Sequence, residues 1–125
     1  MSTTESVIHY LRDEGYPSQL DENGNIIFKA EDCNFIYVDN DEDETFFQLA
    51  LPAFYEVDES NRETALDAAN QCNMELKVVK TCVAGDSVWA MFEVLLDRTP
   101  DVEVMMPRAI RMLLQAKKNF YLSLI

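Results

Sequence analysis

The chain has 125 residues, the usual size of one domain, so the sequence predicts a single domain over residues 1–125. Its formal net charge is -13, from 23 acidic and 10 basic residues, which argues against nucleic acid and anionic membrane surfaces as partners. Apolar residues make up 48% of the chain, a proportion typical of a folded protein rather than a disordered one.

The pattern of apolar residues and cysteines indicates a cellular location. The segment from Met1 to Glu5 has neither a basic stretch nor a long apolar one, and no later apolar run is long enough to cross a bilayer. The three cysteines, Cys33, Cys72 and Cys82, are odd in number and far apart, which is typical of reduced thiols. We therefore expect a cytoplasmic protein.

The N-terminal part of the chain predicts a helix followed by a β-hairpin. Thr3 and Thr4 can cap a helix with apolar residues at helical spacing, and Gly15 is a natural C-terminal stop. An Asn-Gly pair within residues 21–25 tolerates the positive φ of a tight turn, and an apolar run follows at 26–28.

Two more strands are predicted at residues 34–38 and 45–51, which are rich in aromatic and β-branched side chains. The acidic segment 39–44 separates them and is interpreted as a turn. Pro52 has no N–H group for a strand ladder, so the second of these strands is expected to end there, with residues 53–58 connecting onward.

A second helix and a second hairpin follow. Ser60 and Glu63 match a capping box, and the helix behind them is expected to end near Asn73. Residues 76–83 and 88–96 then predict two strands, joined by a short segment in which a Gly-Asp pair can form the turn.

The last helix is expected to begin with Thr99 as its N-cap and Pro100 as its first residue, while Pro107 predicts a kink or a restart. Strands joined by short hairpins, without crossovers or internal repeats, form antiparallel sheets. The predicted fold class is therefore α+β, an antiparallel sheet with helices packed on it.

Catalytic motifs are missing from the sequence. The single histidine, His9, lies on the polar side of the first predicted helix, so no Ser or Cys nucleophile has an obvious base. No C-x-x-C pair indicates a zinc site, and Gly15, Gly24 and Gly85 are too widely spaced for a phosphate-binding loop. We expect no enzyme activity, no metal and no cofactor.

Two acidic segments resemble the start of a calcium-binding loop. The segment starting at Asp39 has Glu44 where the loop needs glycine, and Ala50 where it needs the closing glutamate. The segment starting at Asp21 has its glycine at the fourth place and Ile26 at the sixth. Both segments are interpreted as hairpin turns.

The last two predicted strands are apolar on both faces, and three helices can cover only one side of a sheet in a chain of this length. Bulges or a strongly curled sheet would explain this apolar surplus. The other explanation is a partner, either a second copy of the chain or an extended segment of another protein. The candidate partner-binding residues are Val79, Val83, Trp89, Met91, Leu95, Phe54 and Tyr55.

The element order, the acidic balance and five stretches of sequence together resemble the YbjN family, a bacterial group that shares the fold of type III secretion chaperones. The stretches are residues 11–16, 21–24, 68–80, 88–90 and 106–109. The resemblance spans nearly the whole chain. It implies a sandwich in the order α-β-β-β-α-β-β-α, commonly dimeric, with no catalytic residues to transfer.

The resemblance suggests a function by analogy. Secretion chaperones of this fold are small, acidic, cytoplasmic homodimers that hold a client segment in an extended form over apolar patches. We therefore predict a non-enzymatic protein-binding module, a homodimer that binds a polypeptide client through apolar sheet surface. The alternative hypothesis is a small regulatory or sensory domain with a ligand pocket between helices and sheet, near Trp89, Phe54 and Tyr55.

Overall fold

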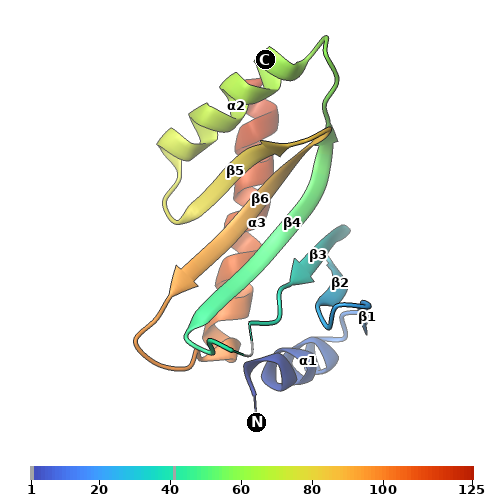
Figure 1. Cartoon of the computed structure of the whole chain (residues 1–125), viewed down its shortest axis with the longest axis vertical. Helices are drawn as coiled ribbons and strands as arrows, with labels where there is room; N and C mark the ends of the chain where they lie inside the picture. Colours follow the sequence, from blue (N-terminus) through green and yellow to red (C-terminus); the bar gives the residue numbers. More distant parts are fainter. Residues whose placement is uncertain (1, 41) are drawn as a thin grey trace.

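The computed structural model describes residues 2–40 and 42–125, in which six strands form one antiparallel sheet with three helices on one of its faces (Figure 1). The strand order across the sheet is β1-β2-β3-β4-β6-β5. The elements are α1 (Thr3–Glu14), β1 (Ser18–Leu20), β2 (Ile26–Ala30), β3 (Cys33–Tyr37), β4 (Phe46–Glu56), α2 (Arg62–Glu75), β5 (Val79–Ala84), β6 (Ser87–Leu95) and α3 (Val102–Ser123). The predicted α+β class is confirmed, and the short β1 adds one strand to the implied order.

The first helix begins slightly earlier than the sequence predicted. The Ser2 hydroxyl accepts a hydrogen bond of 3.1 Å from the backbone N–H of Glu5, so Ser2 is the N-cap and Thr3 and Thr4 lie in the first turn. The predicted stop is confirmed, because Gly15 adopts the left-handed conformation with φ of 77° and closes the helix.

Both predicted hairpin turns are present. In the turn between β1 and β2, the Asp21 carboxylate accepts hydrogen bonds from the backbone N–H groups of Asn23 (2.8 Å) and Asn25 (2.9 Å). In the turn between β5 and β6, Gly85 supplies the positive φ, 67°, and the strands pair up to Ala84 and Ser87. Each of these two turns joins an outermost strand of the sheet, β1 or β5, to the strand beside it.

The predicted capping box of α2 is wrong. The N-cap is Asn61, whose side chain makes no cap hydrogen bond, and the helix begins at Arg62. The Asp58 carboxylate instead accepts hydrogen bonds from the backbone N–H groups of Ser60 (2.8 Å) and Asn61 (3.1 Å). A turn organised by an aspartate therefore precedes the helix, and Ser60 does not exchange bonds with Glu63.

The prediction that Pro52 ends a strand is also wrong, because β4 continues through it. The pairing of β4 with β6 shifts register between Leu51 and Tyr55, and Ala53 has a φ of 43°. Residues 52–54 of β4 lie opposite one residue of β6 and have no paired partner in the ladder, so a residue without an N–H group is accommodated there. The segment expected to be a connection is therefore largely strand.

The last helix differs from prediction at its start. Its N-cap is Asp101, so Thr99 and Pro100 lie before the helix. One helix then runs from Val102 to Ser123 through Pro107, where the sequence predicted a kink or a restart. The missing N–H group of Pro107 removes one backbone hydrogen bond, and packing of the long helix on the sheet offsets that loss.

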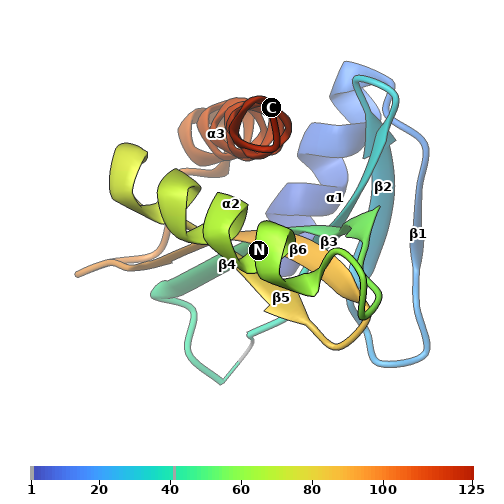
Figure 2. The same cartoon turned by 90° about the horizontal axis from the view of Figure 1, so that it is seen from above.

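The core lies between the sheet and the helices. In β4, the alternate side chains Phe47, Leu49 and Leu51 are at most 2% exposed and face α3. The Phe47 ring centroid lies 5.5 Å from that of Tyr37 and 5.9 Å from that of Phe92. Figure 2 shows the sheet bent around the helices, with β1 and β2 standing steeply beside α1. The bend encloses the core and leaves the other face of the sheet outside.

Candidate functional site

The side of the sheet that faces the viewer in Figure 1 carries no helix of the described chain, and we call it the open face. In β6 the side chains of Val88, Ala90 and Phe92 are buried toward the helices. Side chains alternate along a strand, so the residues between them project from the open face. These residues of β6 are Trp89, Met91, Glu93 and Leu95.

One row of side chains crosses the open face through all six strands, and we call it the central row. Strand pairing aligns Gln19 with Ile27, Ile27 with Ile36, Ile36 with Ala50, Ala50 with Met91, and Met91 with Lys80. Directly opposed residues have Cβ atoms about 5 Å apart. The four inner positions are apolar and the two outer ones polar, so the row is an apolar strip with polar ends.

A charged group lies beside the central row, and both of its oxygens are bonded. The Lys80 ammonium forms an ion pair with Oε1 of the Glu93 carboxylate at 2.6 Å. The Gln48 amide donates a hydrogen bond to Oε2 of the same carboxylate at 2.5 Å. The hydrogen bond to Glu93, with the attraction of its charge, raises the pKa of Lys80 above its ordinary value. Because Glu93 is already paired, a partner can cover it without leaving an unpaired buried charge.

Apolar side chains extend the open face on both sides of the central row. Trp89 pairs with Cys82 of β5, and its indole N–H donates to the Ser87 hydroxyl at 3.0 Å. Toward the other end, Phe46 of β4 pairs with Leu95, which is 74% exposed. The apolar surface therefore follows β6 over most of its length.

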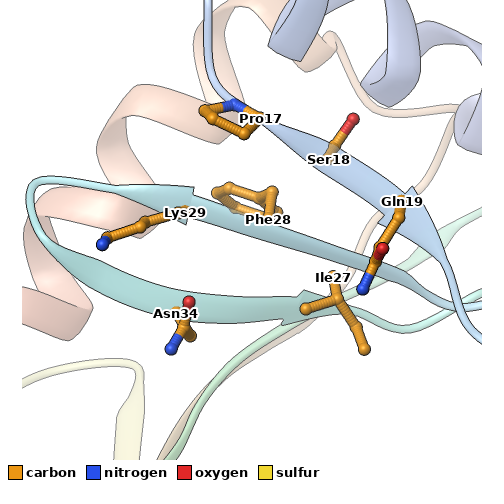
Figure 3. A pocket seen from close by; sticks show the side chains of 7 residues that line it. All are labelled: Pro17, Ser18, Gln19, Ile27, Phe28, Lys29 and Asn34. Carbon is orange, nitrogen blue, oxygen red and sulfur yellow. The ribbon is translucent and has the colours of Figure 1, made fainter.

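A hollow of about 210 Å³ lies at the β1 end of the central row. Figure 3 shows Gln19 and Ile27, the outermost pair of the row, among the side chains that line it. The full lining consists of Pro17, Ser18, Gln19, Ile27, Phe28, Lys29 and Asn34. The apolar strip therefore ends in a recess at its β1 end.

The outer edge of β5 is closed by a side chain of α2. The Asn73 amide donates to the Thr81 carbonyl at 2.9 Å and accepts from the Thr81 N–H at 2.7 Å. This is the bonding that another strand would offer, so the strand edge is blocked at its centre. A polypeptide therefore meets the open face of the sheet more readily than the β5 edge.

The structure brings together only part of the predicted partner-binding set. Trp89, Met91 and Leu95 share the open face. Val79 is 6% exposed and faces the helices, and Val83 packs on the apolar cluster beneath α2. Val79 and Val83 are four residues apart in β5, so alternation places both side chains on the covered face. The partner-binding role of these two valines and of the three residues on the open face stays a prediction.

Phe54 and Tyr55 belong to a different place. Their ring centroids lie 5.5 Å and 5.0 Å from that of Phe120 of α3, and the Tyr121 hydroxyl donates to the Phe54 carbonyl at 2.9 Å. They pack on the helix side of the sheet, whereas Trp89 projects from the open face. These three aromatic residues do not line one pocket.

Sequence reasoning missed Ile27, Ile36, Ala50 and the Gln48–Glu93 contact. The sequence held a partial signal, because Ile27 and Ile36 are large apolar residues that alternate with core residues of their strands, whereas Lys29 and Asn34 at the corresponding positions are polar. The alignment of these residues with Met91 depends on register between strands far apart in the chain. No local pattern reports that register.

Other candidate chemistry remains dispersed. His9 is exposed on α1, and within residues 2–40 and 42–125 no three His, Cys, Asp or Glu side chains gather as metal ligands would. The acidic turn between β3 and β4 forms a hollow of about 420 Å³ lined by Asp39, Asn40, Glu42 and Asp43. Asp41, which belongs to the first of the two segments that resemble a calcium-binding loop, lies outside the described residues. Across the same ranges, each helix is too short or too polar to span a bilayer.

The geometry defines a class of α+β domain with a curved antiparallel sheet, three helices on one face and an open second face. A solved structure of an uncharacterized protein from Methanothermobacter thermautotrophicus is similar over 98% of this chain and 96% of that chain, with a TM-score of 0.67 and 13% identity. The structure of YbjN from E. coli, described as a proposed transcription regulator, is similar over 96% of this chain and 87% of that one, with a TM-score of 0.59 and 12% identity.

No protein-family model and no curated protein matches this chain. At identities of 12% and 13%, the structural similarity establishes a shared fold. The chain has a YbjN-like fold.

Proposed function

We propose that this chain is a non-enzymatic protein-binding module, a cytoplasmic homodimer that holds a polypeptide client on the open face of its sheet. The observation that carries the proposal is the central row, in which Ile27, Ile36 and Met91 are half-buried with no helix over them, while Ala50 between them is 3% exposed. Contiguous apolar surface outside the core is the usual mark of an interaction site.

The charge of the open face supports a protein partner. The charged residues at its paired strand positions are two lysines, Lys29 and Lys80, and two glutamates, Glu56 and Glu93, whose charges cancel. The whole chain carries -13. The open face is thus a neutral area on an acidic protein, where two copies or a copy and a client can approach with the least repulsion.

The chaperone-like role rests on analogy with the fold. Secretion chaperones keep a client segment extended on apolar surface, and the open face offers a row of comparable character across six strands. At about 4.8 Å between neighbouring strands, the row is about 24 Å long. An extended segment of about seven residues would cover it.

A site-specific cross-linking experiment tests the proposal. A photoreactive side chain replaces Met91 on the open face or, as the matched control, Met74 on α2, which is 74% exposed. In the native host, we expect the probe at 91 to cross-link to a discrete polypeptide and to a second copy of the chain. Equal cross-linking from both positions would contradict the proposal.

The size of the protein in solution provides the second test. The substitution Met91→Lys places a charge in the centre of the apolar row, whereas Met74→Lys makes the same change away from it. We expect light scattering to show a dimer for the wild type and for Met74→Lys, and a monomer for Met91→Lys. A wild type that stays monomeric removes the homodimer from the proposal.

The second candidate function is a small regulatory or sensory domain, and the similar structure of E. coli YbjN is described as that of a proposed transcription regulator. The observation that favours it is a hollow of about 190 Å³ beside Phe54, between β3, β4 and α3. The Lys117 ammonium lies there, 3.6 Å from the Cys33 sulfur. A ligand in this hollow should raise the melting temperature, and Lys117→Met should abolish that rise.

A further inference from the structure

The outer face of α3 carries a stripe of residues spaced three or four apart, which places them on one side of the helix. The stripe is Val104, Arg108, Arg111, Gln115, Lys118 and Leu122, and all six residues are exposed. Leu113, Ala116 and Phe120 of the same helix are fully buried against the sheet. The stripe therefore points away from the sheet, on the opposite side of the molecule from the open face.

This stripe is basic in an acidic protein. The helix carries four of the ten basic residues but only Glu103 of the 23 acidic ones, so its net charge is +3 while the rest of the chain carries -16. A solvated surface helix in such a chain would be expected to mix both signs. The concentration of cations on α3 makes it the electrostatic opposite of the remaining surface.

The cations of the stripe have no intramolecular partners in the part of the chain that the structure describes. The ion pairs found there are Lys80 with Glu93 and Arg98 with Asp97. Arg108 and Arg111 are three residues apart on one helix face, where like charges repel each other. Although the chain is rich in carboxylates, none of those described forms an ion pair with Arg108 or Arg111. Acidic side chains of a partner would reduce the repulsion between the two guanidinium groups.

Acidic residues on α1 and α2, on either side of the stripe, restrict the width of an anionic partner. In Figure 2, α3 lies with α1 on one side and α2 on the other. The exposed faces of these neighbours carry Asp13 and Glu14 on α1, and Asp67 and Glu75 on α2. A broad polyanion such as duplex DNA would be repelled by these acidic flanks, whereas a single narrow segment can avoid them.

We propose that the outer face of α3 binds an acidic amphipathic helix of another protein. At about 1.5 Å per residue, Arg108 and Lys118 are about 15 Å apart along α3, and Val104 and Leu122 are about 27 Å apart. The partner that fits is a helix of about 20 residues, with acids at three- and four-residue spacing in its middle and an apolar residue near each end. Val104 and Leu122, which are 47% and 57% exposed, receive those apolar residues.

The probe is a fluorescein-labelled helical peptide of about 20 residues with this pattern, and its control replaces every glutamate by glutamine. Fluorescence anisotropy measures binding to the intact protein. We expect the Glu peptide to bind at least about tenfold more tightly than the Gln peptide, with affinity falling as salt rises.

Two double variants make the same change in net charge. Arg108→Glu with Arg111→Glu should weaken binding of the Glu peptide by at least about tenfold. Lys29→Glu with Lys77→Glu, at exposed positions outside α3, should change it by less than about twofold. Circular dichroism confirms that each variant is folded. Met91→Lys, on the open face, should leave binding of the Glu peptide to α3 unchanged. The proposed peptide site on α3 can therefore fail its test while the proposed function of the open face stands.

The proposal is overturned if the two double variants weaken binding equally, or if the Gln peptide binds as tightly as the Glu peptide. Tighter binding of a 20-nucleotide single-stranded DNA would assign the stripe to nucleic acid instead. A change in the solution size of the protein on reversal of Arg108 and Arg111 would assign it to a second copy of this chain.

Discussion

The two faces of the sheet are built from the same strands yet differ in almost every physical respect. Along β4, Phe47 and Leu49 are fully buried beneath α3, while Gln48 between them lies on the open face and bonds to Glu93. On β5, the Thr81 hydroxyl is buried on the covered face without a hydrogen-bond partner in the described chain, while neighbouring Lys80 is paired on the open face.

This difference shows where stability and binding reside. The covered face is a close-packed interior, in which lost volume is expensive and unpaired polar groups are rare. The open face is apolar at its centre, and the charged pair beside that centre, Lys80 and Glu93, is bonded within the chain. The first face holds the fold together, and the second can be covered by a partner with little electrostatic penalty.

The largest difference should appear on truncating a side chain on each face. Phe47→Ala leaves a cavity between Tyr37, Phe92 and α3 and should lower the free energy of unfolding by about 4 kcal/mol. Met91→Ala on the open face should lower it by less than about 1 kcal/mol. Urea unfolding followed by circular dichroism measures both, and equal losses would mean that the open face is buried in the isolated protein.

We expect a thiol reagent to label Cys82 at a rate at least about a hundredfold higher than that of Cys72. Cys82 is half-buried on the open face, whereas Cys72 of α2 is buried against α3, where burial and then Glu75 raise its pKa to about 11. Labelling of Cys72 requires opening of the core and a thiolate that is scarce at neutral pH. The measurement is mass spectrometry over time in a Cys33→Ser background, and similar rates would contradict the assignment of faces.

The smallest of these effects concerns Tyr10 of α1, on the covered side. Burial, with a contribution from nearby acids such as Glu14, raises the pKa of Tyr10 from 10.0 to about 12. A folded-state pKa above the unfolded value adds stability that is complete below pH 10 and lost as pH rises toward 12. We expect a loss of about 2 kcal/mol in this interval, measured by urea unfolding.

The variant Tyr10→Phe is the control for this titration. It has no phenol to ionise, so its free energy of unfolding should fall less steeply between pH 10 and 12 than that of the wild type. Identical profiles for the two proteins would show that Tyr10 does not report burial on the covered side.

Much of the local structure could be predicted, and the errors have physical causes. The stop at Gly15 and the two hairpin turns were found because a positive φ is a property of one or two residues. The capping box at Ser60 failed because Asp58, two residues earlier, offers a competing acceptor. The strand end at Pro52 failed because pairing with β6 continues on both sides of the irregularity.

The candidate site was predicted only in part, for a similar reason. Trp89, Met91 and Leu95 were identified because alternation within one strand is visible in the sequence. Val79 and Val83 were grouped with them, although β5 turns both toward the helices. Ile27, Ile36 and Ala50 were missed because nothing near them in the chain indicates Met91 as their neighbour.

The sequence by itself therefore determined the acidic charge, the α+β class and the apolar surplus of the last strands, since each depends on composition or on residues close together in the chain. Only the tertiary structure decided which face the helices cover, that the apolar residues of four strands meet in one central row, and that Arg108, Arg111 and Lys118 of α3 lie on the opposite side of the molecule. These features depend on strand register and helix packing between distant residues, where many contacts act together and no single residue carries the signal.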